Sequence, residues 1–221
     1  MGSEVNANHL FHEAQIMTRM ATPASATTDP RQTFRLIARQ YHACHEAILA
    51  MVVELSEEQF RWRPAQGPQS IGWNLWHIAR WDDYLAEVLV QQTPSLGHLV
   101  PARQVWNERN IATKWGLDSA DLGLEDGGTS LTDAQAAAMT FPSKAAVIEY
   151  AEEAFDHLDA VLPDLDDFLI PRILPTVTTE AFPTHDPYGV TVVEMFRHTC
   201  EHLGTMEALK GMLGLRGSVT D

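Results

Sequence analysis

The sequence has little cysteine and few basic residues. Only Cys44 and Cys200 occur among its 221 residues, too few for the disulfide framework of a small secreted domain. Fifteen Lys and Arg stand against 30 Asp and Glu, which gives a formal net charge of -15. Nucleic acid is therefore not expected as a partner, because phosphate contacts need clustered basic side chains.

Long apolar runs are also missing. No stretch approaches the roughly 20 residues of a membrane span, and the acidic charge disfavours binding to an anionic membrane surface. The first 20 residues lack the basic region followed by an apolar region that marks a secretory signal. These absences predict a cytoplasmic protein with no membrane partner.

The rest of the sequence indicates one helical domain, residues 30–215, between a mobile N-terminal tail (1–29) and a C-terminal tail (216–221). Apolar residues recur at intervals of three and four, which is typical of amphipathic helices. Asp29-Pro30, Ser70 and Ser143 are expected start signals, and Gly214 is an expected C-terminal cap. The sequence predicts an all-α fold, a four-helix bundle whose long helices cover about 31–55, 71–91, 144–162 and 190–213.

The connections between these helices are long. Residues 56–69 are rich in Pro and Gly and are expected to form a connector, and residues 102–115 a short helix. The acidic, glycine-rich segment 116–132 is either a lid or binding element or a solvent-exposed insertion. Residues 133–139 are expected to form a brief helix, and 177–182 a possible short strand.

His198 and His202 form the most informative pair in the chain. Their spacing of four places both imidazoles on one helix face, one turn apart. The same face carries apolar residues and should point inward, where imidazoles need partners. Two such rings provide half of a transition-metal site. The apolar residues of this face are Met195, Met206, Leu209 and Leu213.

A third ligand is expected from another helix. His77 is the best candidate, since it lies mid-helix among tryptophans and aliphatic residues, although a core histidine bonded to a backbone carbonyl is the alternative. His42 and His45 could instead hydrogen-bond the ligands and orient them, but an ordinary surface or core position fits both better. His157 is expected at the surface. Three histidines would leave a coordination position for water or substrate, as in catalytic zinc sites.

Other candidates near these residues carry less weight. The segment HTCEH also fits the H-x-x-E-H protease motif with Glu201 as base, but too little chain follows it to supply a third ligand. Cys200 is rotated about 200° from each histidine and is expected to be a small, partly buried residue. Asp82 and Asp83 do not share the face of His77, so no catalytic residue is assigned beyond the ligands. Trp106, Asn107 and Trp115 are expected either to pack in the core or to line a cleft.

Two segments resemble a known family. SIGWNLWHIARWDDYLAEVL (70–89) and HTCEHLGTMEALKGMLG (198–214) are similar to the second-helix and last-helix patterns of DinB-like proteins. That family includes the YfiT-like metal-dependent hydrolases and thiol-dependent S-transferases. The resemblance implies an up-down-down-up bundle, often a homodimer. It implies that His77, His198 and His202 hold a divalent metal, zinc or nickel.

The resemblance also implies a function. Characterised relatives use mycothiol, bacillithiol or glutathione as cosubstrates, and they include S-transferases and a maleylpyruvate isomerase. We therefore expect a divalent-metal-dependent transferase, isomerase or hydrolase that acts on a small molecule, with a low-molecular-weight thiol as a possible partner. The alternative is a non-catalytic stress or binding module in which the metal is structural.

Overall fold

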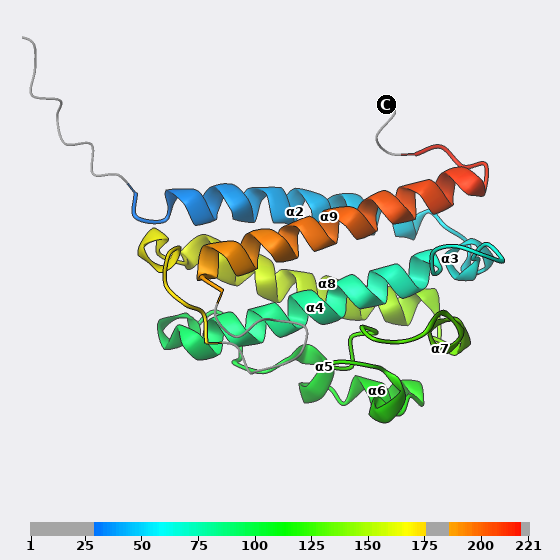
Figure 1. The fold of residues 1–221 in the computed structure, drawn as a ribbon, viewed down its shortest axis with the longest axis horizontal. Coiled ribbons are helices and arrows are strands. Elements are labelled where there is room, and N and C mark those ends of the chain that lie inside the picture. Colours follow the sequence, from blue (N-terminus) through cyan, green and yellow to red (C-terminus); the bar gives the residue numbers. More distant parts are fainter. Residues whose placement is uncertain (1–28, 176–185, 218–221) are drawn as a thin grey trace, which may run out of the picture. The chain divides into compact units, whose positions relative to one another are not determined.

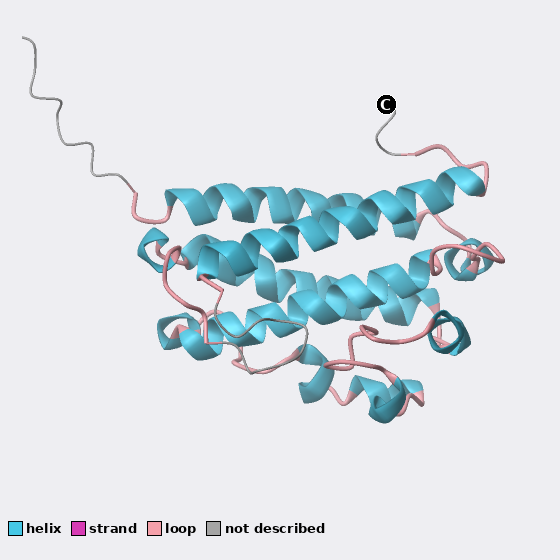
Figure 2. Cartoon of the chain, viewed as in Figure 1, coloured by secondary structure: helices cyan, strands magenta, loops and turns pink. Residues whose placement is uncertain are grey.

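Four long helices account for about half of the residues that the structure describes. The structure is a computed structural model that describes residues 29–175 and 186–217. The long helices are α2 (Gln32–Val53), α4 (Ile71–Gln92), α8 (Lys144–Val161) and α9 (Tyr188–Met212), and they lie side by side (Figure 1). Within the described ranges there are helices and loops but no strand (Figure 2). The prediction of an all-α four-helix bundle is confirmed.

The directions of the four helices follow the up-down-down-up order. In Figure 1, α2 and α9 run one way along the bundle, and α4 and α8 run the other way. Because α4 and α8 are parallel neighbours, the chain between them must return along the bundle before α8 begins. This crossover, residues 93–143, contains the short helices η1 (Pro94–Leu96), α5 (Val105–Glu108), α6 (Ile111–Trp115), η2 (Ser119–Asp121) and α7 (Asp133–Ala138).

Several predicted boundaries hold. The side chains of Ser70 and Ser143 accept from the backbone N–H groups three residues on, and so cap α4 and α8. Gly214 follows α9 with a φ of +73°, the left-handed conformation that glycine adopts most easily. Thr132 caps α7, the brief helix expected at 133–139. No described helix is both long enough and apolar enough to cross a bilayer.

Other boundaries differ from the prediction. The connector 56–69 contains a helix, α3 (Glu57–Arg61), which begins with a capping box between Ser56 and Gln59. The single helix expected over 102–115 is two shorter ones, α5 and α6. The possible strand at 177–182 and residues 1–28 of the expected N-terminal tail lie outside the described residues.

The start of α2 is capped from a distant part of the chain. We expected Asp29 as its N-cap, but the helix begins at Gln32 with Arg31 in the capping position and no side-chain cap of its own. The carboxylate of Asp167, in η4 (Asp167–Leu169), instead accepts from the backbone N–H groups of Thr33 and Phe34 at 2.9–3.1 Å. This partner is more than 130 residues away, so local sequence gives no sign of it.

Helix α4 is enclosed on nearly every side. Its predicted apolar stripe, Ile71, Leu75, Ile78, Leu85 and Leu89, is buried. The opposite faces are buried too, because α8, α9 and the crossover segment surround the helix. Polar side chains on α4 are therefore shielded from water and need partners inside the protein. They are Asn74, His77, Arg80, Asp82 and Asp83.

One of these partners is His45 of α2, which is 2% exposed. Its ring nitrogens lie 3.0 Å from Asp82 of α4 and 3.0 Å from Asp159 of α8. Both nitrogens face carboxylates, which accept hydrogen bonds, so the ring is cationic. Burial alone would lower the pKa of His45, but the two carboxylates outweigh burial and raise it to about 9. The exposed His42 also contacts Asp159, at 2.8 Å. This charged cluster joins three of the four long helices.

We expect the free energy of unfolding to fall as the pH rises from 6.5 through about 9. The pKa of His45 is about 9 in the folded protein against 6.5 for an ordinary histidine. The folded state therefore holds an additional proton in this window and loses that advantage as the proton leaves. A shift of this size corresponds to about 3 kcal/mol. Urea unfolding at a series of pH values measures the slope.

Two variants separate His45 from other titrating groups. His45→Gln should be less stable than the wild type and should show a smaller fall of stability across the same window, since only the exposed His42 still bonds Asp159 there. His98→Gln removes an exposed ring whose Nδ1 donates to the Ser95 carbonyl in the surface turn at 2.8 Å, and it should keep the wild-type slope. A wild-type slope in His45→Gln would contradict the assignment.

Candidate metal centre

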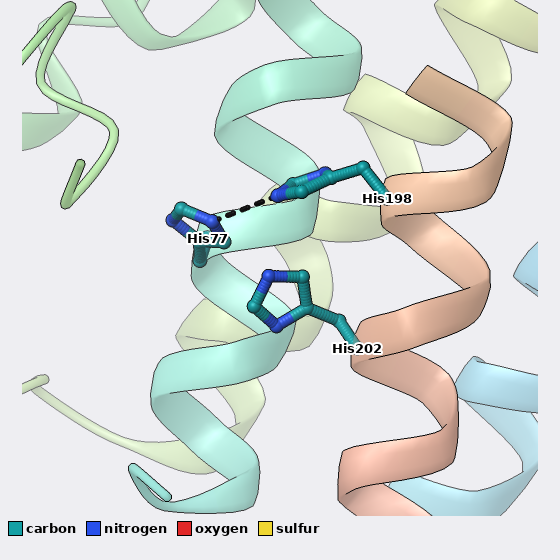
Figure 3. A group of neighbouring side chains, drawn as sticks. All are labelled: His77, His198 and His202. Carbon is teal, nitrogen blue, oxygen red and sulfur yellow. Dashed lines mark hydrogen bonds between the residues drawn. The ribbon is translucent and has the colours of Figure 1, made fainter. Parts of the chain in front are cut away.

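The three predicted histidines meet between α4 and α9. His77 comes from α4, and His198 and His202 come from successive turns of α9 (Figure 3). One ligand atom from each lies within 4.8 Å of the others, and the ring centroids are 4.5–5.0 Å apart. The Nε2 atoms of His77 and His198 face each other at 3.0 Å. Zinc bound at 2.0–2.1 Å would separate its ligands by roughly 3.4 Å, so small side-chain movements complete the geometry.

The orientation of His202 is set by Asn74. The amide nitrogen of Asn74 donates to the backbone carbonyls of Gln69 and Ser70 at 3.0 and 2.9 Å. Its oxygen must therefore point the other way, where it lies 2.6 Å from Nδ1 of His202. An amide oxygen only accepts, so Nδ1 of His202 carries the proton and Nε2 keeps its lone pair.

His77 is fixed in the same way by the crossover segment. Its Nδ1 donates to the backbone carbonyl of Gly127, which leaves the Nε2 lone pair directed at the other rings. Nδ1 of His198 is buried and has no partner among the described residues, so its tautomer is free to adjust. Two of the three rings thus present Nε2 lone pairs to a common point, the arrangement that a divalent cation requires. The residues present fit a metal ion.

Burial keeps all three imidazoles uncharged. The pKa of His77 is well below its usual range, because burial and the adjacent His202 and His198 rings oppose a positive charge. Burial, with His202 and Arg197 nearby, lowers the pKa of His198 to about 4. Burial also lowers that of His202 to about 4. The rings are therefore neutral near pH 7, the state that binds a metal.

Arg80, one turn after His77 on α4, anchors the part of the crossover that contacts His77. The guanidinium donates to the carbonyls of Glu125 and Asp126 at 2.7 and 3.2 Å. The side chains of Trp106 and Ser119 donate to the Asp126 carboxylate at 3.0 and 2.8 Å. Arg80 is held in turn by Gln104, Asp83 and Tyr150 at 2.7–3.3 Å.

The backbone over His77 is closely fitted. Glu125 and Asp126 have φ values of 52° and 54°, which non-glycine residues rarely adopt. Gly128 has a φ of +84°, and a Cβ there would lie 2.8 Å from Trp73 and 3.3 Å from Nδ1 of His77. The Trp73 ring stacks on His77 at 4.6 Å. The alternative of a plain solvent-exposed insertion does not describe the whole of 116–132, because Gly127 and Gly128 are buried against His77.

The remaining sequence candidates lie outside the site. Glu201 is exposed and pairs with Arg197 at 2.5 Å, so its carboxylate is engaged at the surface rather than at the histidines. Asp82 and Asp83 bond elsewhere, as expected. His157, expected at the surface, is half-buried. Within the described residues, no carboxylate or thiol joins the three histidines as a fourth ligand.

The tryptophans of the crossover serve both packing and a cavity. Trp106 is 2% exposed and packs against Trp76, Trp115 and Tyr150. Together with Asn107 it also lines a cavity of about 440 Å³ on the crossover segment. Both alternatives raised for Trp106 from the sequence therefore apply.

Two groups that support the site were not predicted from the sequence, Asn74 and the Gly127 carbonyl. Asn74 was detectable, because an amide three residues before His77 on an apolar helix shares its face. The Gly127 carbonyl was not, because any residue supplies a carbonyl and the contact spans 50 residues.

Known proteins resemble this chain in sequence and in fold. The family model described as the DinB superfamily matches residues 40–206, a range that includes all three histidines. No curated protein matches the chain in sequence. A crystal structure described as a conserved protein of a locus from Enterococcus faecalis has a TM-score of 0.59 at 18% identity, over 79% of this chain and 93% of that chain. At this identity the likeness concerns the fold alone.

We expect Asn74→Leu to weaken zinc binding about 10–100-fold, the usual effect of removing a group that orients a ligand. Leucine cannot accept from His202, so that ring loses its fixed tautomer. His198→Ala removes a ligand and should weaken binding further. Calorimetric titration with zinc measures both, with circular dichroism to verify the fold. Wild-type affinity in Asn74→Leu would show that Asn74 does not orient His202.

We expect Gly128→Ala to lower both stability and zinc affinity. The left-handed backbone costs about 1–3 kcal/mol for a non-glycine residue, and the new methyl group would push against Trp73 and His77. Gly116→Ala is the matched control, since Gly116 has a φ of +72° but a methyl group there would meet no atom within 4 Å. It should show the backbone cost alone and bind zinc normally. Equal zinc affinity in the two variants would contradict the role of the crossover backbone.

Proposed function

This chain belongs to the DinB superfamily, and we propose that it is a divalent-metal-dependent enzyme that acts on a small molecule with the help of a low-molecular-weight thiol. The observation that carries the proposal is the set of three neutral histidines, His77, His198 and His202, with no fourth protein ligand among the described residues. Such a set leaves a coordination position for an exogenous group, which is typical of catalytic rather than structural metal sites.

The charge of the ligand set favours an anionic group in that position. A divalent ion held there would lower the pKa of a bound thiol or water, so that a thiolate or hydroxide forms near neutral pH. Three neutral imidazoles cancel none of the ion's charge, whereas a carboxylate ligand would cancel part of it. The thiolate is the reactive nucleophile in thiol transfer. A thiol cosubstrate therefore fits this ligand set.

The protein's own groups supply orientation and exclusion of water. Asn74 and the Gly127 carbonyl hold protons on the Nδ1 atoms of His202 and His77, so that neither ring has to rearrange when a ligand binds. The Trp73 ring covers one side of His77. Imidazole ligands suit zinc and nickel alike, and we propose one of these two metals. We also propose that the protein is cytoplasmic and that it forms a homodimer.

The thiol branch is tested with the cobalt-substituted protein. Glutathione, mycothiol and bacillithiol are added in turn, with S-methylglutathione as the control that cannot form a thiolate. We expect a thiolate-to-cobalt charge-transfer band with at least one thiol and none with the thioether. If no thiol produces the band, the thiol branch is wrong.

The same cobalt protein tests for catalysis against a structural role. Azide is added as a small anionic ligand. A change in the visible cobalt spectrum indicates an open coordination position, and thiol consumption with a panel of electrophiles then measures turnover. If neither azide nor any thiol changes the spectrum, while chelation still lowers the melting temperature, the metal is structural and the alternative of a binding module holds.

A further inference from the structure

The two cysteines of the chain lie next to each other. Cys44 and Cys200 are the only cysteines in the sequence, and they are 156 positions apart, yet their Sγ atoms are separated by 3.6 Å. Cys44 belongs to α2 and Cys200 to α9. Both thiols are free and partly exposed, so a small reagent can reach them. A disulfide needs a sulfur separation of about 2.05 Å, which modest side-chain rotation and helix movement can supply.

On α9, Cys200 lies on the face opposite to the two candidate metal ligands. Cys200 is two residues from both His198 and His202, and a helix rotates it by about 200° from each. The histidines face α4 (Figure 3), whereas the Cys200 sulfur contacts α2. A bond between the sulfurs would therefore attach α9 to α2 without using the histidine face.

We propose that Cys44 and Cys200 form a reversible internal disulfide, with a low-molecular-weight disulfide as the oxidant. One cysteine sulfur attacks the oxidant, forms a mixed disulfide and releases the first small thiol. The second cysteine sulfur then attacks the protein sulfur of that mixed disulfide and releases the second small thiol. The two cysteines lose two protons and two electrons in total, and both are recovered in the two small thiols.

The surroundings set the rate of this reaction. Burial and the neighbouring Cys200 sulfur raise the pKa of Cys44 to about 12. The Cys44 thiol is therefore protonated at neutral pH, and since only thiolates attack disulfides, its own attack on the oxidant is slow there. The fraction of the pair that is oxidised at equilibrium depends on the ratio of small disulfide to small thiol around the protein. The inference goes beyond the proposed function, because it requires only the two sulfurs and no metal.

The test treats the full-length protein with glutathione disulfide at about pH 8. We expect the free thiols, counted after unfolding, to fall from two to none. On a denaturing, non-reducing gel the protein should still run as a single chain, which shows that no disulfide joins two molecules. Mass spectrometry should show the loss of two hydrogens and a peptide pair joined through Cys44 and Cys200. Because the bond closes a very long loop, the melting temperature should rise by roughly 10 °C. Dithiothreitol should reverse all of these changes.

Three variants make the test specific. Cys44→Ser and Cys200→Ser should each end as a mixed disulfide with one glutathione and show no such rise in melting temperature. His198→Ala, which removes a candidate metal ligand, should still form the internal disulfide, so failure of the metal proposal leaves this result intact. Addition of two glutathiones to the wild type, disulfides only between molecules, or two free thiols after prolonged treatment would each overturn the proposal.

Discussion

The arrangement depends on one constraint, the enclosure of α4 (Ile71–Gln92) on nearly every side. A helix without a solvent face cannot leave polar side chains to water, so each must find a partner inside. Asn74 is bound to α9, His77 to α9 and the crossover, Arg80 to the crossover, and Asp82 to α2. These hydrogen bonds determine how the neighbouring segments are placed. The candidate metal centre is one member of this set of contacts.

The same constraint accounts for the neutral state of the three site histidines. Buried imidazoles are kept neutral, and the protein chooses which nitrogen carries the proton in His77 and His202. His45, equally buried, has the opposite charge state because it lies between two carboxylates. Burial therefore does not decide the charge of a histidine by itself; the partners that enclose it do. The Nδ1 atoms of His77 and His202 face carbonyl oxygens, and within the described residues no carboxylate is hydrogen-bonded to any of the three site histidines.

Features that depend on neighbouring residues could be predicted from the sequence, whereas contacts between distant segments could not. The helices and the His198–His202 pair were predictable, because apolar periodicity and a spacing of four are local properties. His77 was indicated by its apolar neighbours. The cap of α2 by Asp167 and the Gly127 carbonyl were not, since they join segments far apart and depend on the fold alone. Helix α3 was missed although its Ser56–Gln59 capping box was readable.

The parallel pairing of α4 and α8 has a consequence for how such a protein can diversify. The 22 residues of α4 extend about 33 Å, and a tight turn cannot link the end of one parallel helix to the start of the next. A long crossover is therefore obligatory, and here it supplies the carbonyl and the glycines that cover His77. The three histidines lie on α4 and α9, whereas the residues that cover His77 lie in the crossover. Insertions and substitutions in the crossover can thus change which molecules reach the three histidines while the histidines themselves stay the same.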